Sequence, residues 1–147
     1  MIKRVDHVHV VAKDMGRSID FYTRVLGFRL VRRLEFGPPD RRRQLSYVGL
    51  GDMLLELVQP SHEGEFLGTE ARPLGLAVDD LDSTVAQLKS LGVEVVNDPA
   101  PAFSFGGRQA VIRDPSGLAI ELREWDPVDL PPNPDWEPER SDVVRLS

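Results

Sequence analysis

Three side chains of this sequence, His7, Glu56 and Glu121, have the chemistry of metal ligands. Imidazole nitrogens and carboxylate oxygens bind divalent transition-metal ions, and a carboxylate can also take up or release a proton. The two glutamates lie inside the otherwise apolar stretches DMLLELV and GLAIELR, where an unpaired carboxylate is costly to bury. Two such carboxylates need a shared partner, and a metal ion also held by His7 is the simplest one.

The candidate ligands occupy corresponding places in an internal repeat. The first copy begins VDHVHVVAKDMGRSIDFYTRVLGF at Val5, and the second begins ARPLGLAVDDLDSTVAQLKSLGV at Ala71. The two copies align Glu56 with Glu121, while His7 aligns with Pro73. Proline has no side-chain lone pair that could bind a metal. The repeat therefore offers three ligands at four symmetric places.

The apolar periodicity of the first copy predicts a strand, a helix and three further strands. Alternation over residues 5–11 predicts a strand that is buried on both faces and carries His7 and His9 on one of them. Asp14 is a good N-cap for the helix, and Gly27 a good end. The predicted strands that follow are residues 28–36, 44–50 and 53–59, the last two joined by a tight turn at Gly51 and Asp52.

The second copy predicts the same order of elements. A strand at residues 73–78 precedes a helix with one apolar face, and a further strand begins at residues 93–96. The apolar face of this helix is formed by Leu81, Val85, Leu88 and Leu91. Residues 108–113 and 118–123 are predicted to pair across the turn Asp114-Pro115-Ser116-Gly117. Both copies are therefore predicted to be βαβββ modules.

Two segments lie outside the repeat. Residues 60–70 are the expected linker between module one, residues 1–59, and module two, residues 71–124. From Trp125 to the end, residues 125–147 form a proline-rich tail that we expect to be extended or partly disordered. Trp125 and Trp136 are costly to leave in water, so the tail is expected to dock on the body or on a second subunit, with a lid over the pocket as the alternative.

Composition limits the class of protein. The chain has 147 residues, 41% of them hydrophobic and 29% charged, which is typical of one globular domain. It has no cysteine, no membrane-spanning apolar run and no signal-peptide pattern, so we expect a cytoplasmic protein whose metal is held by nitrogen and oxygen. A net charge of -6 argues against nucleic-acid binding. The basic run Arg41-Arg42-Arg43 is interpreted as a solvated loop in preference to a specific anion site.

Several motifs together resemble one superfamily. They are DHV at Asp6, SIDFYTRVLGF at Ser18, LLELV at Leu54, LAVDDLD at Leu76 and RDPSGLAIEL at Arg113. These motifs resemble the vicinal oxygen chelate superfamily, which includes glyoxalase I, methylmalonyl-CoA epimerase, bleomycin-binding proteins and extradiol dioxygenases. The resemblance covers residues 2–124 and implies an α+β fold of two tandem βαβββ modules that form a cleft-containing half-barrel. A divalent metal in that cleft would be held from positions that correspond to His7, Glu56, Pro73 and Glu121.

The resemblance implies a class of chemistry and leaves alternatives open. Three ligands leave open positions for substrate, and their oxygen-rich character favours manganese, iron(II), cobalt or nickel over a tetrahedral zinc, with zinc left open as an alternative. Glu121 or Glu56 would act as the base, and His9 would bind substrate, act as acid or base, or serve as a further ligand. The first hypothesis is a lyase or isomerase of the glyoxalase and epimerase type that acts on a small oxygenated metabolite.

Two other functions remain open at this point. A metal-free protein that sequesters a drug or metabolite is supported by Pro73 and by the acidic net charge, while a ring-cleaving dioxygenase is less favoured because it would need His9 as a ligand. Alternatively, the glutamates of a lapsed site would hydrogen-bond to histidines, arginines or water. The expected partners are a small molecule and a second copy of the chain, with neither nucleic acid nor membrane.

Overall fold

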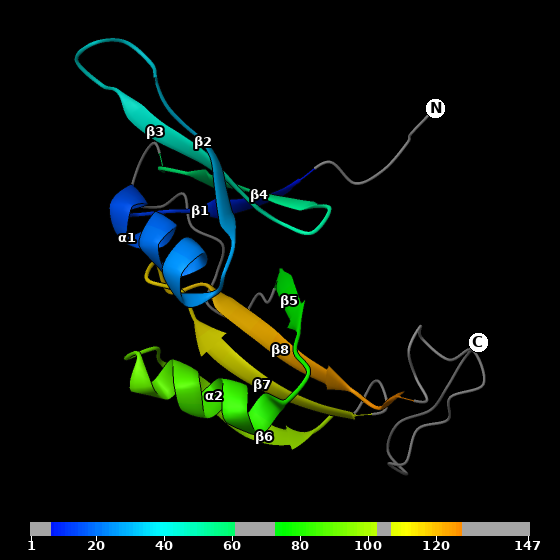
Figure 1. Ribbon diagram of the computed structural model, residues 1–147. Helices are drawn as coiled ribbons and strands as arrows, with labels where there is room; N and C mark the ends of the chain where they lie inside the picture. The colour runs from blue at the N-terminus through cyan, green and yellow to red at the C-terminus, as the bar shows by residue number, and fades with distance from the viewer. Residues whose placement is uncertain (1–6, 61–72, 103–106, 128–147) are drawn as a thin grey trace, which may run out of the picture. The chain divides into compact units, whose positions relative to one another are not determined.

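The computed structural model describes residues 7–60, 73–102 and 107–127 (Figure 1). The chain divides into two compact units, residues 1–69 with 114–118 and residues 70–113 with 119–147. The first unit contains β1 (Val8–Val11), α1 (Met15–Asp20), η1 (Phe21–Val25), β2 (Arg29–Phe36), β3 (Arg43–Leu50) and β4 (Met53–Val58). The second contains β5 (Leu74–Ala77), α2 (Leu81–Ser90), β6 (Val95–Pro101), β7 (Gly107–Arg113) and β8 (Ala119–Trp125). The prediction of two βαβββ modules is confirmed.

The two modules have the same sheet topology. Their strand orders are β1-β4-β3-β2 and β5-β8-β7-β6. In each sheet the first strand pairs in parallel with the last strand of the module, and the other neighbours are antiparallel. The described strands form open sheets and no closed barrel. Shared order and shared strand directions establish the internal repeat as a repeat of structure.

Apolar side chains on one face of each sheet form the core beneath its helix. In the first unit, Tyr22 of η1 and Leu55 and Leu57 of β4 are fully buried. In the second unit, α2 packs on its sheet (Figure 1). Leu81 of α2 and Ile120 and Leu122 of β8 are buried. Burial of such side chains contributes most of the free energy of folding. None of the helices in the described residues is long and apolar enough to span a bilayer.

Both module helices begin and end as the sequence predicts. The Asp14 Oδ1 accepts a hydrogen bond from the Arg17 backbone N–H at 3.0 Å, and the Asp80 Oδ1 accepts one from Ser83 at 2.9 Å. Gly27 and Gly92 follow the helices with the same positive φ of 78°. One prediction is wrong: Leu91 is 54% exposed and lies outside the buried face of α2. Leu91 is the C-cap residue, where the backbone leaves the helical path, so its side chain does not continue the buried face of the helix.

The helical segment of the first module changes its geometry midway. α1 continues directly into η1, a π-helix, where the Leu26 N–H donates to the Phe21 carbonyl five residues earlier, at 3.0 Å. The second module has a single α-helix in the equivalent place. Between the capping aspartate and the terminal glycine, the first module contains one residue more than the second. The wider π turn accommodates this residue.

The turn between β7 and β8, residues 114–118, groups with the first unit. The buried Asp114 carboxylate accepts hydrogen bonds from the backbone N–H groups of Ser116 at 2.9 Å and Leu118 at 2.8 Å, and from the Tyr22 hydroxyl at 3.2 Å. Burial raises the pKa of Asp114, and burial together with the Asp114 charge raises the pKa of Tyr22. The predicted Asp-Pro-Ser-Gly turn is thus held by its own aspartate and by one tyrosine.

The strands match their predicted ranges to within about two residues at most ends. β8 reaches Trp125, which was predicted to begin the tail. Trp136 and most of the predicted linker and tail lie outside the described residues.

Candidate functional site

The first candidate cluster lies on the sheet of the first unit around Glu56. β4 carries Glu56 between two neighbours, with His9 of β1 on one side and Tyr47 of β3 on the other in the pairing register. His7 precedes β1 by one residue and stands two residues before His9. Because side chains alternate along a strand, His7, His9 and Tyr47 lie on the same sheet face as Glu56.

The side chains of this cluster meet at the Glu56 carboxylate. The Tyr47 hydroxyl donates to Glu56 Oε1 at 2.8 Å. The other carboxylate oxygen, Oε2, lies 3.1 Å from His7 Nε2 and 3.6 Å from His9 Nδ1. The His7 and Tyr47 rings also make an edge contact, with their centroids 6.2 Å apart. The structure therefore places three polar side chains around one carboxylate. His7 and His9 were predicted from the sequence, and Tyr47 was not.

The exposure of this cluster corrects one prediction. The side chains of His7 and His9 are 34% and 50% exposed, so β1 is buried on the opposite face only, where Val10 is 1% exposed. The Glu56 side chain is 16% exposed. The sequence pattern could not distinguish a strand buried on one face from a strand buried on both, because valines on both faces suggest burial on both. A half-exposed histidine beside a largely buried carboxylate remains accessible to a ligand.

The second glutamate, Glu121, lies on β8 of the second unit with different neighbours. It pairs with Gly75 of β5 and with Val111 of β7. Its Oε1 accepts a hydrogen bond from Arg123 Nε at 2.6 Å, and the Glu121 side chain is 12% exposed. The Arg123 guanidinium also lies over the Trp125 ring, 5.8 Å from its centroid. An arginine on the same strand face therefore holds this carboxylate.

The pairing registers show which positions of the two modules correspond. His9 pairs with Glu56 as Gly75 pairs with Glu121, so His7 corresponds to Pro73, as the sequence alignment predicts. Pro73 is exposed and precedes β5 by one residue. By the same register, Tyr47 corresponds to Val111. The second module therefore lacks each of the polar groups that meet Glu56 in the first.

The donors in the first unit suit two neighbouring positions on a metal ion. Two ligands that each lie about 2.1 Å from an ion at a right angle are about 3.0 Å apart. The separation between His7 Nε2 and Glu56 Oε2 is 3.1 Å. In the part of the chain that the structure describes, no three histidine or acidic side chains form a cluster that could hold a metal ion. The third predicted ligand, Glu121, belongs to the second unit.

Two neighbours of the candidate residues were not singled out from the sequence. Tyr47 could have been found from the hairpin register, because it lies directly opposite Glu56 once the turn at Gly51 and Asp52 is accepted. Arg123 could have been found from strand periodicity, because it stands two residues after Glu121 on the same face. These contacts include the histidine and arginine partners expected of a lapsed site, and the same contacts also orient ligands in metal sites.

Comparison with known proteins gives consistent matches. The model of the Glyoxalase/Bleomycin resistance protein/Dioxygenase superfamily matches residues 4–122. The chain is 32% identical over 126 residues to a lactoylglutathione lyase of Escherichia coli O157:H7, covering 82% of this chain and 92% of that protein. It is also 32% identical over 136 residues to a probable chloroplastic lactoylglutathione lyase of Arabidopsis thaliana, covering 88% of this chain but only 38% of that longer protein.

Solved structures give the same fold. Glyoxalase I of Leishmania major superposes with a TM-score of 0.63 and 28% identity, covering 84% of this chain and 87% of that chain. An antibiotic-binding protein from Streptomyces sp. CB03234 superposes with a TM-score of 0.62 and 29% identity, covering 85% and 98%.

Proposed function

Because the chain belongs to the Glyoxalase/Bleomycin resistance protein/Dioxygenase superfamily, we propose that it is a metal-dependent lyase of the glyoxalase type acting on a small oxygenated metabolite. The observation that carries this proposal is the cluster of His7, Tyr47 and His9 around the Glu56 carboxylate. Relatives at about 32% identity are named lactoylglutathione lyases. Their name suggests a thioester of glutathione as the first product to test.

The metal would be held by His7, Glu56 and Glu121. Bound there, a divalent ion would polarise the oxygens of the substrate and stabilise negative charge that develops on them. The candidates are manganese, iron(II), cobalt, nickel and zinc, because the donors are one nitrogen and two carboxylates. The Tyr47 hydrogen bond to Glu56 Oε1 supports this role, since it fixes one carboxylate oxygen and leaves Oε2 toward His7.

The remaining residues would act directly on the substrate. Glu121 would take a proton from a carbon next to a carbonyl, with Glu56 as the alternative base. Arg123 would hold the Glu121 carboxylate in place through the 2.6 Å hydrogen bond. His9, which is half exposed beside Glu56, would donate a hydrogen bond to a substrate oxygen.

Turnover and metal content test this proposal together. Purified protein should convert glutathione and a 2-oxoaldehyde into the corresponding 2-hydroxy thioester, and chelation should abolish this activity until metal is added back. Glu121→Gln should lower kcat by about 10³-fold while metal remains bound, because the variant keeps a donor oxygen but loses the base. Metal analysis of both proteins and a thioester assay provide the measurements. An active Glu121→Gln variant would refute the assignment of the base.

The same experiment separates the enzyme from a sequestering protein. A metal-free binder would bind its ligand equally well with and without chelator, and Glu121→Gln would change that affinity only modestly. Absence of turnover with any metal, together with chelator-insensitive ligand binding, would therefore overturn the lyase proposal.

A second copy of the chain is the proposed macromolecular partner, and the cytoplasm is the proposed location. Large apolar side chains are exposed on β2 and on the β3–β4 hairpin, where β2 is the edge strand. They are Leu30, Val31, Leu34, Leu50 and Met53. Exposed apolar groups on an edge strand favour association. Light scattering should give the mass of a dimer, and Leu34→Asp should shift it toward the monomer.

A further inference from the structure

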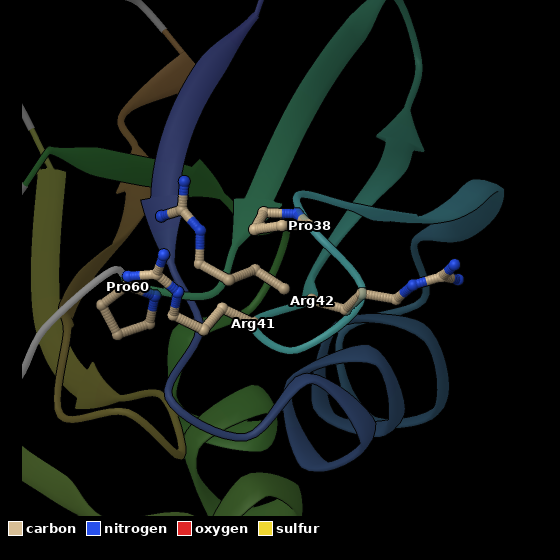
Figure 2. A pocket seen from close by; sticks show the side chains of 5 residues that line it. Pro38, Arg41, Arg42 and Pro60 are labelled. Atoms are coloured by element: carbon tan, nitrogen blue, oxygen red, sulfur yellow. The ribbon is translucent and has the colours of Figure 1, made fainter.

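A pocket in the first unit is lined almost entirely by arginine and proline. Its volume is about 460 Å³, and its lining comes from the β2–β3 loop and the segment after β4 (Figure 2). The lining residues are Pro38, Arg41, Arg42, Arg43 and Pro60. From the sequence, we interpret the three arginines as a solvated loop. Their arrangement around one pocket is a reason to reconsider that interpretation.

The described carboxylates that pair with Arg41 and Arg42 neutralise these two side chains only weakly. Arg41 Nε lies 3.5 Å from Asp40 Oδ2, and both side chains are more than 70% exposed. Arg42 Nη1 lies 3.5 Å from Glu35 Oε2, and both are more than 50% exposed. Exposed pairs at this distance contribute little to stability, and neither is the two-pronged contact that a guanidinium makes with a well-placed anion. The pocket therefore keeps a positive character in a chain of net charge -6.

The third arginine is positioned by the sheet itself. Arg43 begins β3 and pairs with Phe36, and its guanidinium lies over the Phe36 ring at 4.7 Å from the centroid. Its Nη1 also donates to the Gln59 carbonyl at 3.4 Å. Contacts of this kind restrict the rotamers of a long side chain before any ligand arrives.

The pocket lies at one end of the sheet face that carries Glu56. Tyr47 pairs with Glu56 and Leu45 with Val58, so two residues further along the two chains are Arg43 and Pro60, which both line the pocket. Pro60 is four residue steps after Glu56. In extended chain this is about 13 Å at about 3.3 Å per residue. The half-buried side chains of Leu45 and Val58 lie between the two sites. An elongated small molecule could therefore span from the arginines to Glu56.

We propose that this pocket binds the phosphate group of a small molecule, and that it orients a phosphate-bearing substrate along the sheet face toward Glu56. In Figure 2 one of the three arginine side chains points away from the other two, so two guanidinium groups face the same side. Two such groups suit an anion with two charges and at least three acceptor oxygens, whereas one terminal carboxylate needs a single arginine. The statement about substrate rests on the proposed lyase function. Binding of the phosphate group itself does not.

Calorimetric titration of the full chain with pyrophosphate tests the pocket without any turnover. Binding should be saturable, and Arg41→Gln should weaken it by about tenfold or more, because a charge-assisted contact is lost. Arg24→Gln is the matched control, since Arg24 is an exposed arginine on η1 that pairs with Asp20 away from the pocket. It should leave the affinity unchanged.

Three outcomes would overturn the phosphate assignment. They are no saturable binding, equal weakening by Arg24→Gln, and an arginine-dependent preference for glutathione, a carboxylate probe, over pyrophosphate. Glu56→Gln distinguishes this proposal from the proposed function, because it should abolish turnover and leave pyrophosphate binding intact. If the pocket orients the substrate, the phosphomonoesters that compete with pyrophosphate should include the substrates with the highest kcat/KM. Faster turnover of phosphate-free analogues would contradict this role.

Discussion

The two modules carry a glutamate at the same position of their last strand and surround it in different ways. The Glu56 carboxylate lies 2.8 Å from the Tyr47 hydroxyl and 3.1 Å from His7 Nε2, and both of these groups can rearrange around a bound cation. Glu121 meets one guanidinium, Arg123, at 2.6 Å. The backbone registers around both glutamates are equivalent. The surroundings of the two glutamates therefore differ through their neighbouring side chains, while the strand pairing is the same.

This difference suggests a division of labour between the modules. A carboxylate beside imidazoles has neighbours that can join it in binding a metal, whereas a carboxylate beside a permanently charged guanidinium is fixed in orientation. We therefore expect module one to dominate metal affinity and module two to contribute mainly to proton transfer. Equivalent positions in the modules provide matched pairs of variants with which to test this division.

The largest contrast is expected between His7→Ala and Pro73→Ala, which change corresponding positions. His7→Ala should weaken binding of nickel or cobalt by about 100-fold or more, because a donor is lost, whereas Pro73→Ala removes none and should leave affinity unchanged. Equilibrium dialysis with metal analysis gives the affinities, and circular dichroism checks that both variants fold. Similar affinities in the two variants would remove His7 from the metal site.

A smaller effect is expected from Tyr47→Phe, which removes only the hydroxyl that holds Glu56 Oε1. Metal affinity or kcat/KM should fall by about tenfold, as for other groups that orient a ligand. Tyr22→Phe is the control, because its hydroxyl bonds Asp114 instead. That variant should lower the free energy of unfolding by about 1 kcal/mol in denaturant titrations, with metal affinity unchanged. The reverse pattern would contradict the role of Tyr47.

The smallest effect is expected from Pro73→His, which gives module two the histidine of module one. The position is exposed and lies just before β5, where a histidine is sterically acceptable. Metal binding should tighten by a few-fold if Pro73 occupies the fourth ligand position. Unchanged affinity would mean that His9 or water completes the site, or that the ligand positions of the two modules do not correspond.

The sequence predicted the order of elements because that order depends on local patterns. Asp14, Asp80 and Gly92 mark helix ends through their own backbone and side-chain chemistry, so one sequence suffices to find them. Leu91 was assigned wrongly because helical periodicity continues through a C-cap residue whose backbone no longer follows the helix. The exposure of the histidine face of β1 depends on what packs against it, which strand alternation does not encode.

The candidate site was predicted in its residues more than in its contacts. His7, His9 and Glu56 could be grouped because the repeat and the strand period place them on one face. Tyr47 and Arg123 were not found, because a side chain's partner across a sheet depends on the pairing register and on rotamers that the sequence leaves open. The metal and the roles of Glu56 and Glu121 remain predictions.

The π-helical turn of η1 also shows where the two copies of the repeat differ in length. The ends of this helical segment are anchored, by the Asp14 cap before it and by Phe28 after it, whose N–H donates to the Tyr22 carbonyl at 2.8 Å. A residue inserted between fixed ends cannot extend the helix and instead widens one turn. Deleting one residue within Phe21–Val25 should therefore give a continuous α-helix of the length found in the second copy.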